Sequence, residues 1–144
     1  MVSIEGIRGP GAVVVWDRVD GSPAYCSTDG RVETMALSND GQRLACAGPD
    51  GTVRLVATNG ETAPAHLAVG LKQVTCLAFS ADDRTLAIGG DGAAVKLWDV
   101  PTLQERVSLP GHRGGVRFVG FAGSNPILVT AARTGTARLW RAAP

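Results

Sequence analysis

An internal repeat constrains the fold of this chain more than any other feature of its sequence. Residues 32–56, 74–98 and 116–140 align without gaps at a constant spacing of 42 residues. The alignment places apolar residues on apolar residues, as Leu55, Leu97 and Leu139 illustrate. Fixed periods of about 20–50 residues are typical of repeat proteins, whose units stack on one another because none buries its apolar face alone. The period therefore predicts a repeat architecture.

Each period predicts four short β-strands and no helix, because no segment shows a sustained helical apolar pattern. In the clearest repeat the strands are expected at residues 74–79, 85–89, 94–98 and 106–109. The first of these is expected to be fully buried. In the preceding repeat the fourth strand, residues 63–68, contains Pro64. Because proline is tolerated at a sheet edge, the fourth strand is expected to be outermost.

Short motifs recur at the repeat spacing. Trp98-Asp99 ends one expected third strand, and Trp16-Asp17 ends another near the amino terminus. Trp140 keeps only the tryptophan, and Gly111-His112 precedes the last repeat. Together these residues resemble the signature of the WD-repeat β-propellers, which build four-stranded blades around a central channel.

The resemblance covers residues 1–144 and implies an all-β fold, a partial β-propeller of WD-type four-stranded blades with about three and a half blades per chain. Repeats are expected near 18–57, 58–99 and 100–141, with residues 1–17 forming part of a preceding blade. Such an open arc exposes two blade faces. The residues expected on these faces are Val13, Val15, Val119 and Leu139.

The resemblance also implies a buried hydrogen-bond network in the last repeat, formed by His112, Thr130 and Trp140. Arg133-Thr134 replaces the aspartate that completes this network in the family, so this repeat is expected to be less rigid unless Arg133 compensates. Cys46 and Ile88 stand where Thr130 does, and apolar packing is expected there. The structural repeat motif is therefore assigned to Trp16, Asp17, Trp98, Asp99, Gly111, His112, Thr130 and Trp140.

Composition excludes several classes of function. The formal net charge of +1 argues against a nucleic-acid partner, whose binding domains are plainly basic. The longest apolar runs are strand-sized, and residues 1–10 lack the features of a signal peptide, so a membrane role is not expected. Three cysteines at unrelated repeat positions favour reduced thiols in a cytoplasmic protein over a disulfide framework or a zinc site.

No catalytic residue, metal site or cofactor is predicted. His112 is explained by the repeat motif, and His66 lies in an outer strand without a partner histidine nearby. Asp82 and Asp83 occupy a turn, where carboxylates bind backbone amides. Cys76 lies in a buried strand without a neighbouring base. The glycines at 89–92 precede a strand rather than a helix, unlike a phosphate-binding loop.

The resulting hypothesis is a non-catalytic protein–protein interaction scaffold, completed by self-association with a homodimer preferred. The alternatives are a remnant or subunit of a larger propeller protein, and a hydrolase with a site in the central channel. The hydrolase would need ionisable residues converging at equivalent repeat positions, and none is expected. The partner-binding rim is assigned to Arg8, Arg31, Lys72, Arg113 and Arg133. The opposite, acidic rim is assigned to Asp17, Asp20, Asp40, Glu61, Asp82, Asp83 and Asp99, with Arg18 and Arg84 as counter-charges.

Overall fold

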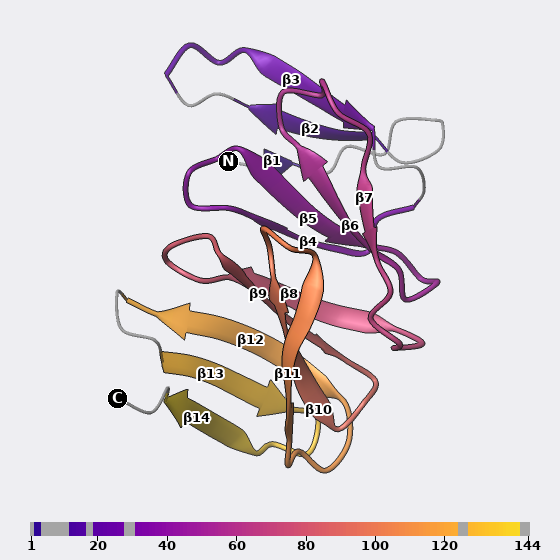
Figure 1. Ribbon diagram of the computed structural model, residues 1–144, viewed down its shortest axis with the longest axis vertical. Helices are drawn as coiled ribbons and strands as arrows, with labels where there is room; N and C mark the ends of the chain where they lie inside the picture. The colour runs from indigo at the N-terminus through magenta and orange to yellow at the C-terminus, as the bar shows by residue number, and fades with distance from the viewer. Residues whose placement is uncertain (1, 4–11, 17–18, 28–30, 124–126, 142–144) are drawn as a thin grey trace.

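The computed structural model describes residues 2–3, 12–16, 19–27, 31–123 and 127–141. Their strands form four antiparallel sheets, each running through the sequence without a crossover. Figure 1 shows the sheets one after another along the long axis, from the indigo first sheet to the yellow fourth. No helix occurs in the described ranges, so none could cross a membrane. The predicted all-β fold of partial propeller blades is confirmed.

The strand bounds follow the repeat. The first sheet contains β1 (Val2–Ser3), β2 (Ala12–Trp16) and β3 (Pro23–Ser27). The second contains β4 (Thr34–Leu37), β5 (Arg43–Ala47), β6 (Val53–Ala57) and β7 (Ala65–Leu67). The third contains β8 (Val74–Phe79), β9 (Thr85–Gly90), β10 (Ala94–Asp99) and β11 (Gln104–Pro110). The fourth contains β12 (Val116–Ala122), β13 (Ile127–Ala132) and β14 (Ala137–Arg141).

The second, third and fourth sheets are arranged radially, with their first strands innermost. β8 lies between β4 and β12 and contacts both. In the second and third sheets the fourth strands, β7 and β11, are outermost, as Pro64 predicted. β7 starts one residue after Pro64, and β11 is longer than the expected 106–109 because its pairing with β10 extends from Asp99 to Ala94.

The cores lie between the sheets because alternate residues of each strand point to opposite faces. Leu86 and Ile88 of β9 pack toward the second sheet, in a cluster that includes Leu55. Ala87, between them in sequence, packs toward the fourth sheet beside Leu128. The second and third sheets therefore supply apolar residues to both of their neighbours, and the sheets depend on one another for burial.

This alternation corrects two expectations about exposure. Val13 and Val119 are buried because their faces point to a neighbouring sheet, and Val15 packs in the same cluster as Val13. Of the four residues expected on open faces, only Leu139 is exposed, at 66%. β8 is also not fully buried, since Thr75 faces outward near the central axis.

A polar latch joins the second and third sheets at their turns. Asp83 accepts hydrogen bonds from the backbone amides of Asn39 and Asp40, at 2.7 and 2.9 Å. The Asn39 side-chain amide also donates to Asp83 and to the carbonyl of Ser80. Asp83 adopts a left-handed conformation, with φ of 57°, that aims its carboxylate across the junction.

Candidate interaction surface

One rim of the arc is built from two sets of loops that interlock. Residues 68–73 and 111–115 enter inner strands, and residues 48–52, 91–93 and 133–136 join second to third strands. The backbone amide of Asp91 donates to the carbonyl of Gln73 at 3.1 Å, and that of Arg133 donates to Gly115 at 2.9 Å. A Cβ at Gly51, whose φ is +74°, would lie 2.0 Å from the carbonyl oxygen of Leu71. The loops therefore form one continuous surface, called the basic rim below.

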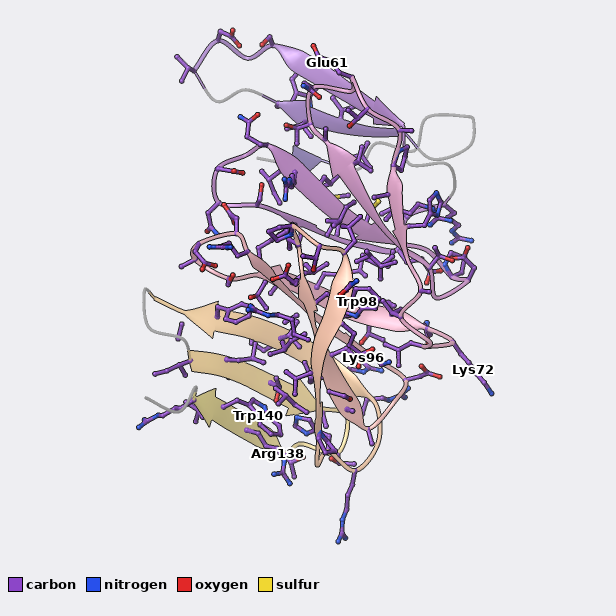
Figure 2. All side chains as sticks on the ribbon, in the orientation of Figure 1. Glu61, Lys72, Lys96, Trp98, Arg138 and Trp140 are labelled. Carbon is purple, nitrogen blue, oxygen red and sulfur yellow. The ribbon has the colours of Figure 1, made fainter. Side chains whose placement is uncertain are left out.

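The basic rim carries most of the cations that the sequence assigned to it. Arg31, Lys72, Arg113 and Arg133 are all exposed, and none forms an ion pair within the described ranges. Figure 2 shows Lys72 extending away from the ribbon. Arg8 lies outside the described residues.

The acids of the basic rim are partly neutralised. Asp50 pairs with the buried Arg54 at 3.2 Å and also accepts a hydrogen bond from the amide of Thr52. The Thr52 amide is the main reason why the pKa of Asp50 is lowered. Asp91 accepts a hydrogen bond from the amide of Gln73 at 3.3 Å. Part of the negative charge is thus used in holding the loops, whereas the cations face solvent.

A hollow of about 510 Å³ opens where the inner strands meet this rim. Its polar and charged lining includes Glu33, Gln73, Thr75, Asp91, Arg117 and Arg133. Among these, Glu33, Thr75 and Arg117 are equivalent repeat positions, and so are Asp91 and Arg133.

Sequence reasoning missed this convergence and expected no ionisable residues at equivalent positions, which is wrong. The spacing of 42 residues was the signal that could have found it. Each equivalent set carries opposite charges rather than paired carboxylates, an arrangement suited to binding charged groups.

The opposite rim, called the acidic rim, is formed by the turns that join first to second and third to fourth strands. Its carboxylates are held by local hydrogen bonds. The Ser38 hydroxyl, with the Gln42 amide, holds the pKa of Asp40 below its usual value. The Ser80 hydroxyl does the same for Asp82, and the Thr102 hydroxyl lowers the pKa of Asp99.

Not all of these acids are free to bind a partner. Asp99 also pairs with Arg106 at 3.6 Å, and Asp83 belongs to the latch between sheets. Asp20 is exposed and binds the Ser22 amide, and Glu61 is exposed beside Asn59. Asp17 and Arg18 lie outside the described residues.

The structure brings together three residues of the repeat motif in the fourth sheet. His112 Nε2 lies 2.7 Å from Thr130 Oγ1, and Trp140 Nε1 donates to the same oxygen at 2.9 Å. His112 Nδ1 is buried and has no hydrogen-bond partner among the described residues. Burial, followed by the nearby Arg138, lowers the pKa of His112. Gly111 precedes it with φ of +134° and borders the Arg138 guanidinium.

The remaining motif residues have different surroundings. Trp98 is 7% exposed and lies among the side chains between the second and third sheets (Figure 2). Its Nε1 has no hydrogen-bond partner in the described part of the chain. Asp99 caps the following turn by accepting from the amide and hydroxyl of Thr102. Trp16 is 39% exposed on the first sheet.

The residues considered for catalysis do not form a reactive site. His66 is exposed on β7, whereas His112 is buried in the fourth sheet. Burial raises the pKa of the Cys76 thiol, which opposes thiolate formation. Within the described ranges no three His, Cys, Asp or Glu side chains gather so that they could hold a metal ion.

Comparison with known proteins finds the WD domain, G-beta repeat model at residues 23–56, 62–99 and 103–141. The chain is 29% identical to Telomerase protein component 1 of Rattus norvegicus, over 90% of this chain and 5% of that protein. It is 35% identical to Transducin beta-like protein 3 of Bos taurus, over 92% of this chain and 18% of that protein. SEC12-like protein 1 of Arabidopsis thaliana is 27% identical over 80% of this chain and 31% of its own length.

This chain thus spans less than a third of the length of each of these relatives. The three matched segments cover most of the chain, and each extends to the end of a third strand, at Val56, Asp99 and Arg141. The blades described above are therefore WD repeats, and the chain belongs to the WD domain, G-beta repeat family.

Proposed function

We propose that this chain is a non-catalytic protein–protein interaction scaffold whose basic rim binds an acidic surface of a protein partner. WD repeats are typical of such scaffolds, and family membership supports the general class. The observation that carries the choice of surface is the contrast between the rims. The exposed cations of the basic rim lack ion-pair partners in the described ranges, and Arg133 lines the hollow together with Arg117, while carboxylates of the acidic rim hold turns.

Electrostatics favours this use of the basic rim. A cluster of exposed cations steers association with an oppositely charged surface even when the whole protein is nearly neutral. Arg117 and Arg133 line the hollow, which suits a carboxylate-bearing loop or chain end. A protein partner in the cytoplasm remains our expectation, and the near-neutral net charge favours a protein over a nucleic acid.

A pull-down from native lysate followed by charge reversal tests the proposal. We expect Arg31→Glu with Arg113→Glu to slow association and to weaken its dependence on salt, leaving the circular dichroism spectrum unchanged. The matched control is Arg43→Glu with Arg84→Glu, which changes the net charge equally at exposed positions of the acidic rim. Nuclease treatment of the lysate should not release the partner.

The control variants also show which of the two rims binds the partner. Equal losses in both double variants would mean that only net charge matters, and a loss confined to the control would assign binding to the acidic rim. Asp83 is unsuitable for this purpose because its carboxylate joins two sheets. Arg43 and Arg84 avoid that difficulty.

We also propose that the chain self-associates, with a dimer preferred. Because the first and fourth sheets have three strands each, two copies would bring together about seven to eight blades' worth of strands, within the usual range for propellers. Light scattering at micromolar concentration tests this, since a well-folded monomer would contradict it. A monomer would favour the alternative in which these blades serve as a segment or subunit of a larger propeller protein.

A further inference from the structure

The outer face of the fourth sheet is apolar and uncovered in the described structure. Phe118 is 53% exposed and Leu139 is 66% exposed. Strand pairing places Val129 opposite Leu139 and Ala131 opposite Phe118, on the same face. The other face of this sheet packs against the third sheet through Val119 and Leu128. One side of the sheet is therefore a buried core, and the other is a similar surface without a neighbour.

Repeat equivalence identifies this outer face as a sheet-to-sheet interface. Phe118, Val129 and Leu139 stand 42 residues after Cys76, Ala87 and Leu97. Those three residues of the third sheet pack against the fourth sheet in one apolar cluster. The fourth sheet thus presents to solvent the residues with which its predecessor binds the next blade.

Two of the three internal junctions show what such a face packs against. At the junctions before the third and fourth sheets, the following sheet contributes a second-strand leucine and a third-strand tryptophan. These are Leu86 and Trp98 of the third sheet, and Leu128 and Trp140 of the fourth. The second sheet has Leu44 with Val56 in the tryptophan's place. The complementary surface is therefore the tryptophan-bearing face of a WD blade.

Among the described residues, the first sheet carries a partly exposed tryptophan at the matching position, with the buried Val14 on the same face. Trp16 is equivalent to Trp98 by the repeat motif and is 39% exposed. Val13 and Val15 of the same strand pack against the second sheet, so the alternation of β2 points Trp16 to the opposite side. Figure 1 shows the first and fourth sheets at opposite ends of the molecule.

From these observations we infer head-to-tail pairing of two copies, in which the face formed by Phe118, Val129 and Leu139 packs on the Trp16 face of a second copy. This inference rests on the proposed self-association and specifies its surfaces. The pairing is heterologous, joining two different patches, and two such junctions between two copies close a ring. Both faces leave the basic rim free for a partner.

The molar masses of three variants in solution test the pairing. We expect wild type to be dimeric by light scattering, and Leu139→Asp and Phe118→Asp to be monomeric with unchanged circular dichroism, since both side chains are already exposed. The matched control is Val107→Asp on the outer strand β11, where the side chain is 43% exposed, and it should remain dimeric. A Leu139→Asp protein that stays dimeric overturns the inference.

Mixing distinguishes the head-to-tail arrangement from pairing of two identical faces. Trp16→Asp should also be monomeric, and a mixture with Leu139→Asp should form a dimer through the one remaining pair of intact faces. A Trp16→Asp protein that dimerises normally overturns the inference in favour of two fourth sheets packing together.

Cross-linking covers the case in which Trp16→Asp fails to fold. A photoreactive benzoylphenylalanine at position 118 of the otherwise native chain should link to the strand Ala12–Trp16 of a second copy. Links to the fourth sheet of a second copy, links elsewhere, or no intermolecular link would each overturn the pairing. A monomeric wild type overturns it together with self-association, whereas the rim proposal is judged separately by the pull-down with Arg31→Glu and Arg113→Glu.

Discussion

The third and fourth sheets stabilise an equivalent tryptophan in different ways. Both carry a tryptophan at the end of their third strand, but Trp98 is buried among apolar side chains with its Nε1 unpartnered in the described structure. Trp140 instead donates to Thr130, which also binds His112. The third sheet has Ile88 where the fourth has Thr130. One repeat position can thus be stabilised either by burial or by a polar network. The third and fourth sheets should therefore respond differently to mutation, to pH and to restoration of the missing carboxylate.

The largest effect is expected at the apolar site. Trp98→Ala should destabilise the protein by about 3–5 kcal/mol, because it removes a large aromatic side chain from the core between two sheets. Trp98→Phe should cost much less, since the indole nitrogen forms no hydrogen bond with the described residues that would be lost. Thermal unfolding followed by circular dichroism measures both. Equal losses would mean that the indole N–H contributes after all.

At the polar site, removal of the shared acceptor should cost less than loss of Trp98. Thr130→Val keeps the shape of the side chain but leaves Trp140 Nε1 and His112 Nε2 without their partner, at a cost of about 1–3 kcal/mol. Thr136→Val, in the exposed loop before β14, is the control and should change stability little. The comparison between the sheets fails if Thr130→Val is neutral in chemical denaturation.

Acidification should affect the fourth sheet before the third. Burial lowers the pKa of His112 below its ordinary value of 6.5, so the unfolded chain binds a proton at higher pH than the folded protein does. The stability contributed by neutral His112 is therefore complete above about pH 6.5 and is lost as pH falls through the lowered pKa. The loss is at most about 1.4 kcal/mol per pH unit. Chemical denaturation between pH 7 and 5 should show this decrease in the free energy of unfolding of the wild type. If the same decrease persists in His112→Asn, another titratable group causes it.

The smallest effect is expected from repair of the polar network. Thr134→Asp restores a carboxylate to the loop where the family resemblance expects one, and His112 Nδ1 lacks a partner among the residues that the structure describes. We expect the new hydrogen bond to raise the pKa of His112 and to add about 1 kcal/mol of stability near neutral pH. NMR titration of the imidazole checks the shift. Arg133→Asp is the comparison, and an unchanged pKa in both variants would place the acceptor elsewhere.

The strands were predictable because their signals are local. Alternating apolar residues, turn glycines and the position of Pro64 located β8 at its observed bounds and placed the fourth strands outermost. The network of His112, Thr130 and Trp140 followed from resemblance, and the structure brings these three side chains together. The domain boundaries and the roles assigned to the rim cations remain predictions.

The predictions that failed concern contacts between sheets that are far apart in sequence. Val13 and Val119 were expected on open faces, yet which face of a strand is covered depends on a neighbouring sheet far away in sequence. Arg117 was missed because its importance arises only where three inner strands meet around one hollow. Asp83 was expected to bind backbone amides and does so, but the sequence did not indicate that one of these amides belongs to Asn39 of another repeat, 44 residues away.

The sequence by itself determined the period, the strand order within each blade and the family, because these depend on side-chain alternation and turn chemistry along the chain. Only the tertiary structure decided which faces are covered, how the loops interlock into a basic rim and why Trp16 and Leu139 remain exposed at opposite ends. The physical reason is that burial is a property of pairs of sheets. A repeat specifies both surfaces of a blade, but the neighbour that occupies each surface is set by the stacking of blades in space.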